Sequence, residues 1–198
     1  MTRLRLRSLL LAAGAFALFS CAEPTAPTSS TAAPSTLFGL PIGGGGGVGT
    51  LVDTTVTAVQ RAVPLLADVS ASATIGYEGG SIVLPGTGFR LDVPKGAVLQ
   101  PTTITVTAVA GSTVAYEFEP AGTTFAKRLV VTQDLSLTTI VSSLLGRSVT
   151  GAYFRSRDEL FPDGTAKVHE LEPTTVDLTT LTTRFSIGHF SGYIMATD

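Results

Sequence analysis

The sequence is short of the residues on which many binding and catalytic sites depend. Its 198 residues include no tryptophan, two histidines and one cysteine. One cysteine excludes a disulfide within the chain, and two histidines without a cysteine pair supply too few ligands for a structural zinc site. We therefore expect no cofactor. Stability has to come from an apolar core, which a composition of 44% hydrophobic residues can supply.

Charge is also sparse, and it becomes acidic once the first 20 residues are set aside. Lys and Arg number 13 and Asp and Glu number 15 in the whole chain. Three of the arginines precede residue 21, so the remainder has 10 basic and 15 acidic residues, a formal net charge of −5. No basic patch that would bind phosphates is left. The composition therefore argues against nucleic acid as a partner.

The single cysteine, Cys21, directly follows a basic and then apolar N-terminus. Arginines at 3, 5 and 7 precede an uncharged run over residues 9–19. A transmembrane helix needs about 20 apolar residues, so this run is too short to span a bilayer, but it fits the apolar region of a signal peptide. The pattern resembles the signal peptide and lipobox of bacterial lipoproteins. In that family the peptide bond before the cysteine is cut, and the thiol carries a diacylglycerol.

The lipoprotein resemblance implies a cellular location and a membrane partner. Residues 1–20 would be a signal peptide, and the exported chain would be anchored in a lipid bilayer through acylated Cys21. Ala22 follows the cysteine in place of an aspartate, which in that family favours the outer membrane. We therefore expect a lipid-anchored protein of the cell envelope. The alternative is an ordinary secretory signal with a leftover thiol.

Residues 21–50 have the composition of a disordered tether. Prolines lie among Thr, Ser and Ala, and five consecutive glycines occupy positions 43–47. Such a stretch buries too little apolar surface to offset the entropy lost on ordering. In residues 51–67, apolar side chains recur near helical spacing up to Pro64. This spacing predicts a short helix or a linker before the domain.

Residues 68–198 have the pattern of an all-β domain. Apolar and polar residues alternate in Ile104-Thr105-Val106-Thr107-Ala108-Val109, and glycine- or proline-containing turns separate the runs. Many short strands at this spacing predict a β-sandwich or a β-barrel. Residues 137–145 instead carry a helical stripe, which predicts one short inserted helix at an end of the sandwich. The predicted strands cover residues 69–75, 81–84, 89–93, 103–109, 114–119, 129–133, 149–154, 166–171, 175–178, 182–187 and 190–196.

Two motifs in the middle of the chain have a characteristic spacing. Residues 88–98 read Gly-Phe-Arg-Leu-Asp-Val-Pro-Lys-Gly-Ala-Val, an apolar strand that runs into Pro-x-Gly-Ala. Residues 118–125 read Phe-Glu-Pro-Ala-Gly-Thr-Thr-Phe, of the form Pro-x-Gly-x-x-Phe. Together with residues 79–82 and 103–106, they resemble a ZU5 domain, the β-sandwich module of ankyrins, netrin receptors and many bacterial surface proteins. The resemblance implies a non-enzymatic interaction module, whose partner would be an envelope protein or a cell-wall component.

One motif near the C-terminus bears on chemistry. His189-Phe190-Ser191 resembles the His-Phe-Ser sequence at which certain ZU5-containing proteins cleave themselves. By that resemblance, the Ser191 hydroxyl would attack the Phe190 carbonyl, His189 would act as general base, and water would hydrolyse the resulting ester. The alternative is that Phe190 is a core residue and that its two neighbours satisfy local backbone groups.

The hydrophobic pattern around this motif also changes. Buried positions are expected at Phe185 and Ile187, which are odd, and then at Phe190 and Ile194, which are even. The strand must therefore switch faces, and Gly188 is the expected site of a bulge or bend.

Two further readings complete the sequence-based hypotheses. His169 and Glu170 lie in an alternating strand with Lys167 and Glu172, which predicts a solvated edge in preference to a metal site. A glycan- or cell-wall-binding module is the remaining alternative function, although few aromatic side chains are present to stack on sugars.

Overall fold

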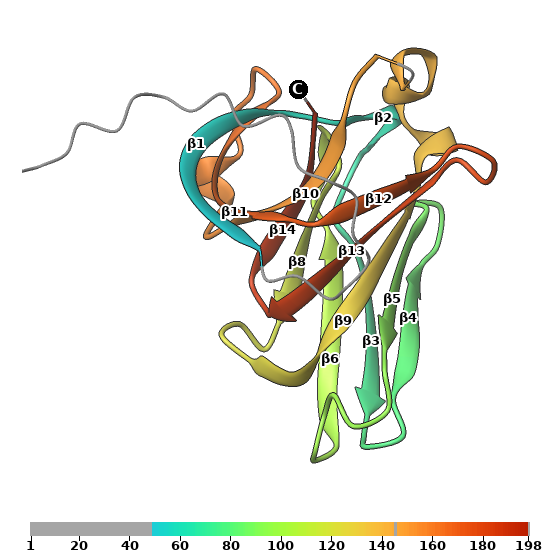
Figure 1. Cartoon of the computed structure of the whole chain (residues 1–198), viewed down its shortest axis with the longest axis vertical. Coiled ribbons are helices and arrows are strands. Elements are labelled where there is room, and N and C mark those ends of the chain that lie inside the picture. Colours follow the sequence, from blue (N-terminus) through green and yellow to red (C-terminus); the bar gives the residue numbers. More distant parts are fainter. Residues whose placement is uncertain (1–48, 145, 198) are drawn as a thin grey trace, which may run out of the picture. The chain divides into compact units, whose positions relative to one another are not determined.

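The computed structural model describes residues 49–144 and 146–197, and this part of the chain is almost entirely β-structure (Figure 1). Three 3₁₀-helices interrupt the strands: η1 (Leu135–Leu137), η2 (Thr139–Ser143) and η3 (Arg157–Glu159). The strands are β1 (Thr50–Ala58), β2 (Gln60–Leu65), β3 (Val69–Ile75), β4 (Gly80–Leu84), β5 (Phe89–Val93), β6 (Thr102–Ala108), β7 (Gly111–Thr113), β8 (Ala115–Glu119), β9 (Thr124–Asp134), β10 (Val149–Phe154), β11 (Thr165–Glu172), β12 (Thr174–Asp177), β13 (Thr182–His189) and β14 (Gly192–Thr197).

Two antiparallel sheets form the sandwich. The seven-stranded sheet has the order β1-β11-β10-β14-β8-β6-β3, and the five-stranded sheet has the order β12-β13-β9-β5-β4. The main core comes from alternate positions of these strands. In β5, for example, Phe89, Leu91 and Val93 are buried while Arg90 is exposed. The predicted all-β sandwich is confirmed.

Aromatic side chains fill the centre of this core. The ring centroids of Phe89 and Tyr116 lie 4.3 Å apart, and those of Phe118 and Phe190 lie 5.3 Å apart. Tyr193 meets Phe118 edge-on at 5.7 Å. Because these rings come from β5, β8, β14 and the segment before β14, they join both sheets.

The N-terminal strand closes a second, smaller core. β1 pairs with β11 and, over its last two residues, with β14, so that β1, β11, β10 and β14 form a closed ring of paired strands. Figure 1 shows β1 curving around this end of the molecule. Few strands enclose little space, which suits a core built largely of alanine. Its buried residues are Ala58, Ala115, Ala152, Phe154, Ala166, Val168, Ile194 and Ala196.

The expectation of a short helix or linker over residues 51–67 is wrong, because β1 and β2 occupy this segment. Its side chains explain the difference: Thr and Val predominate from residue 52 to 57, and β-branched residues favour strands. A register shift in the pairing of β1, between Leu51 and Thr54, also offsets the alternation. Val52 and Val56 consequently recur at a helix-like interval while both pack on the smaller core.

The inserted helix is shorter than residues 137–145 suggested. Two 3₁₀-helices, η1 and η2, stand there, with Leu135 and Ile140 buried and Leu137 and Val141 exposed. The segment is rich in Ser and Thr, whose side chains bond to nearby backbone groups, as the Thr138 hydroxyl does to the Leu135 carbonyl at 2.6 Å. Leu145 lies outside the described residues.

Candidate functional site

The His-Phe-Ser motif lies where β13 ends and β14 begins. The pairing of β13 with β9 is regular up to Ile187↔Leu129 and then jumps to His189↔Thr124. One residue of β13, Gly188, therefore faces four residues of β9. The irregularity expected at Gly188 is confirmed, but the extra residues belong to the opposite strand.

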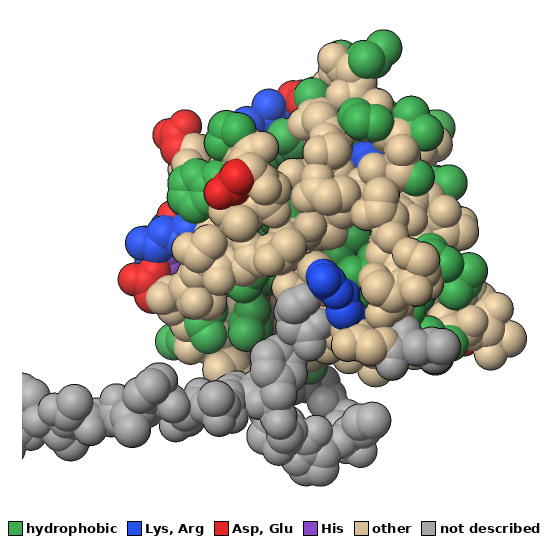
Figure 2. All heavy atoms as spheres, turned by 90° about the horizontal axis from the view of Figure 1, so that it is seen from above, with side chains coloured by type: hydrophobic (Ala, Val, Ile, Leu, Met, Phe, Trp, Pro, Cys, Tyr) green, Lys and Arg blue, Asp and Glu red, His purple; other side chains and the backbone are tan. Residues whose placement is uncertain are grey.

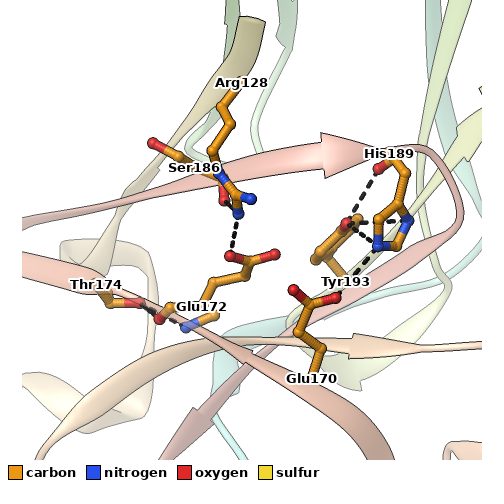
Figure 3. A network of polar contacts seen from close by, with 8 residues as sticks. Arg128, Glu170, Glu172, Thr174, Ser186, His189 and Tyr193 are labelled. Carbon is orange, nitrogen blue, oxygen red and sulfur yellow. Dashed lines mark hydrogen bonds and ion pairs between the residues drawn. The ribbon is translucent and has the colours of Figure 1, made fainter. Parts of the chain in front are cut away.

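The bulge in β9 folds Arg128 over Gly188. A Cβ atom on Gly188 would lie 3.2 Å from Nη1 of Arg128, so the glycine leaves room for the guanidinium. Nη2 of Arg128 donates to the Ser186 carbonyl and to the Glu172 carboxylate. The bulge thus places a positive charge against β13 just before the motif, as Figure 3 shows.

The backbone of the motif is held on both sides. The Phe190 N–H donates to the Thr123 carbonyl at 2.8 Å, and the Phe118 N–H donates to the Ser191 carbonyl at 2.9 Å. The Phe190 carbonyl accepts from the Gly122 N–H at 2.9 Å. Gly122 has φ +76° in the turn after β8, a conformation that favours glycine. A fixed N–H on this carbonyl oxygen is what a developing negative charge there would require.

Ser191 and His189 point to different partners. The Ser191 hydroxyl lies 3.5 Å from the Phe154 carbonyl, a long hydrogen bond. Nε2 of His189 lies 3.3 Å from Oε2 of Glu170, and the Tyr193 hydroxyl lies 3.4 Å from Nδ1 of His189 (Figure 3). None of the hydrogen bonds found in the described residues joins Ser191 to His189. The nucleophile and the general base that the resemblance implies are therefore not hydrogen-bonded to each other in the described residues.

The sequence did not reveal Glu170 as the partner of His189, because its strand was expected to be a solvated edge. That expectation is wrong. β11 lies between β1 and β10, so it is an inner strand. His169 is buried, and its Nε2 lies 2.7 Å from Oε1 of Glu159. Glu170, on the opposite face of the strand, points to His189. The two acidic neighbours lie 10 and 19 residues from their histidines, a separation that only the folded chain reveals.

A buried ion pair stands beside this site. The Glu172 side chain is fully buried, with Arg128 as its charged partner. Burial raises the pKa of Glu172 to about 7, although the positive charge of Arg128 opposes the shift. Burial also raises the pKa of Tyr193, and the negative charges of Glu172 and Glu170 raise it further. Two acidic side chains, Glu170 and Glu172, and the guanidinium of Arg128 thus lie beside the motif.

A shallow hollow of about 610 Å³ forms a second candidate site, where β1 passes into β2. Arg157 lies in its wall and is held by Asp68 at 2.7 Å and by Glu117 at 2.5 Å. Phe161 is partly exposed there. The hollow is lined by residues 57, 58, 60, 109–113, 157 and 160–164. Its wall offers an ion-paired arginine and one aromatic ring to a ligand.

The face seen in Figure 2 carries few charges. Seen from above, Lys, Arg, Asp and Glu are scattered singly or in small groups, and uncharged polar and apolar groups cover most of the face (Figure 2). In the described residues no helix is long and apolar enough to cross a membrane. Cys21, the predicted signal peptide of residues 1–20 and almost all of the predicted tether lie outside the described residues.

Comparisons with known proteins support one part of these hypotheses. The family model of the ZU5 domain matches residues 71–134, which run from β3 to the end of β9. No curated protein matches the sequence. A ZU5 domain is therefore present, and at this coarse level the chain contains a protein-interaction module. Apart from Ala115, the buried residues of the smaller core lie outside the matched segment, and so does the His-Phe-Ser motif.

Proposed function

We propose that the protein is an interaction module held at the cell envelope by lipid on Cys21, where it binds an envelope protein or a cell-wall component. The ZU5 domain at residues 71–134 is the observation that carries the interaction role. The basic and then apolar N-terminus and the single cysteine support the anchor. Several acyl chains on one cysteine give firm attachment, because each buried methylene contributes about 0.8 kcal/mol.

The length of chain between anchor and domain favours a long reach. Residues 22–48 separate Cys21 from the first described residue, and a fully extended chain of that length spans at most about 95 Å. A domain on such a tether can meet partners well away from the bilayer surface. Its own surface needs no membrane-binding features, and no helix of the described residues could span a bilayer.

Two measurements test this function. The wild-type protein should partition into detergent, and Cys21→Ser should remain in the aqueous phase; equal partitioning would refute lipid attachment. For the interaction, chemical crosslinking in envelope preparations should join the domain to a specific partner. A surface variant in the hollow, Phe161→Asp, tests whether the partner binds there. Crosslinks that are neither reproducible nor saturable would contradict the interaction role.

We propose self-cleavage between Phe190 and Ser191 as a second candidate function. The Gly122 N–H on the Phe190 carbonyl favours it, and so does Glu170, which lies close enough to orient His189. The Ser191 hydroxyl would have to rotate from Phe154 toward the Phe190 carbonyl carbon. A free side-chain rotation of this kind needs no change in the backbone.

Self-cleavage at this bond requires only groups of the chain itself and one water molecule. Oγ of Ser191 bonds to the Phe190 carbonyl carbon and gives its proton to His189. The C–N bond then breaks as His189 returns the proton to the Ser191 nitrogen, which leaves an ester. Water hydrolyses the ester to a Phe190 carboxyl group and restores the Ser191 hydroxyl. The released segment would stay in place, because β14 pairs with β1, β10 and β8.

Intact mass under denaturing conditions tests self-cleavage. Cleavage predicts that the wild type loses the segment from residue 191 onward, while Ser191→Ala keeps its full mass. Glu170→Gln should slow the reaction without abolishing it, since Glu170 acts only through His189. One full-length mass in all three proteins would exclude this candidate and leave the interaction role untouched.

A further inference from the structure

The seven-stranded sheet is closed at one end and open at the other. At the closed end, β1 pairs with both β11 and β14. At the open end, β3 pairs with β6 over all seven of its residues without a bulge. Within the described part of the chain, no strand pairs with the second side of β3. The backbone groups on that side are therefore available to another strand.

β3 lacks the features that usually keep edge strands apart. It reads Val-Ser-Ala-Ser-Ala-Thr-Ile, with no charge and no proline. Proteins commonly protect edges with lysine, proline, bulges or very short strands. None of these protects β3, and its small side chains leave the backbone accessible.

The outer face of this edge carries ordered hydroxyl groups. Ser70 and Thr107 lie 2.8 Å apart, Ser72 and Thr105 lie 2.8 Å apart, and a third pair, Thr74 and Thr103, lies 2.9 Å apart. These exposed pairs form three parallel rows that end at β3. The inner face of β3 carries Val69, Ala71 and Ala73, which pack on the core but stay partly exposed.

We propose that β3 pairs antiparallel with β3 of a second copy of this chain, joining two seven-stranded sheets edge to edge. In the register that pairs all seven residues, Ser72 faces Ser72 of the partner subunit and Ser70 faces Thr74 of the partner subunit. Each hydroxyl row then continues across the new interface. A slip by one residue would set hydroxyls of one copy beside alanines of the other on the same face of the joined sheet, which disfavours it.

A second copy suits this edge better than a charged peptide does. The edge is neutral and self-complementary: hydroxyls meet hydroxyls on the outer face and small apolar groups meet on the inner face. A single pair of seven-residue strands buries less surface area than a stable protein–protein interface, for which the lower end is about 1,200 Å². The dimer should therefore be weak in solution, with a Kd of about 0.1–1 mM. The inference does not depend on the lipid anchor, which would only raise the local concentration of the copies.

Thiol crosslinking tests the proposed register. Ser72→Cys is made in a chain that also carries Cys21→Ser, so that the new thiol is the only one. Residues directly opposite in antiparallel strands have Cβ atoms about 4.5–5.5 Å apart, close to disulfide geometry. The matched control is Thr105→Cys, which loses the same hydroxyl pair but lies one strand inside the edge.

Crosslinking rates are divided by each thiol's reaction rate with a small disulfide reagent, which corrects for exposure. The corrected dimerisation of Ser72→Cys should be at least about tenfold faster than that of Thr105→Cys. A mixture of Ser70→Cys and Thr74→Cys should form the mixed disulfide in preference to either homodimer. Equal corrected rates for Ser72→Cys and Thr105→Cys would overturn the proposal.

A charge variant provides an independent test by sedimentation at about millimolar concentration. Ser72→Lys sets two lysines directly opposite each other and should weaken the dimer about fivefold or more. Thr105→Lys breaks the same internal hydroxyl pair without placing charge at the edge, so it should dimerise like the wild type. A monomeric wild type, or equal weakening by both lysines, would refute edge pairing.

Discussion

The buried carboxyl of Glu172 should make the protein less stable as pH rises. Its pKa is raised by burial from the ordinary value of 4.5 to about 7 in the folded state. The folded protein therefore holds this proton more tightly than the unfolded chain does. The resulting stabilisation is complete below about pH 4.5, declines as pH rises toward 7, and is lost above that.

The magnitude follows from the two pKa values. Their difference corresponds to about 3 kcal/mol over the full range, most of which falls between pH 5 and pH 8. Glu172→Gln keeps the shape of the protonated side chain but cannot ionise. The difference in unfolding free energy between wild type and variant should therefore move by about 2–3 kcal/mol in favour of the variant over this range.

Urea unfolding at pH 5, 6, 7 and 8 measures this difference. The difference between the two unfolding free energies cancels the contributions of other groups that titrate over the same pH range. Glu119→Gln, which removes an exposed carboxyl from β8, is the control and should follow the wild type at every pH. If the unfolding free energies of wild type and Glu172→Gln change with pH in parallel, the folded protein does not raise the pKa of Glu172, and the prediction is refuted.

Three further substitutions test the packing. Gly192→Ala should destabilise by about 1–3 kcal/mol, since its Cβ would lie 2.3 Å from the Phe154 ring; an unchanged urea midpoint would contradict that close approach. Phe118→Ala should cost about 3–5 kcal/mol by emptying the centre of the core, and a loss below 1 kcal/mol in the same assay would argue against its central place. Arg61→Met should cost about 2–4 kcal/mol in thermal unfolding, because the buried guanidinium donates to carbonyls of Val109, Thr113 and Ala115; a neutral effect would mean that water replaces it.

Most strand positions within residues 68–198 followed from the sequence, although β7 had no predicted counterpart and β9 begins five residues before its predicted start. β3, β5 and β10 match the predicted ranges, and most other strands differ by one or two residues at an end. Alternation is informative here because one face of each strand meets the core. The ZU5 motifs also place turns at fixed positions, so in this region the alternation of the strands and the turn residues predict the same elements.

The sequence could not predict the smaller core or the partners of the histidines. β1 pairs with strands more than 100 residues away, and its bulge disturbs the pattern that would have identified it. Glu170 and Glu172 look like solvent-facing residues of an alternating strand. They are enclosed because β11 lies between two strands and under Arg128, which the bulge in β9 brings back over β13. Each of these placements depends on pairing between distant segments.

The closed ring of β1, β11, β10 and β14 imposes an order on folding. β14 is the last strand in the described part of the chain, yet it stands in the middle of the seven-stranded sheet, between β10 and β8, and it also pairs with β1. The strands on either side of β14 cannot join into one sheet until residues 192–197 have been synthesised. A chain synthesised from its N-terminus would therefore keep an unfinished core until this strand has been made. The arrangement delays closure until the whole domain is available.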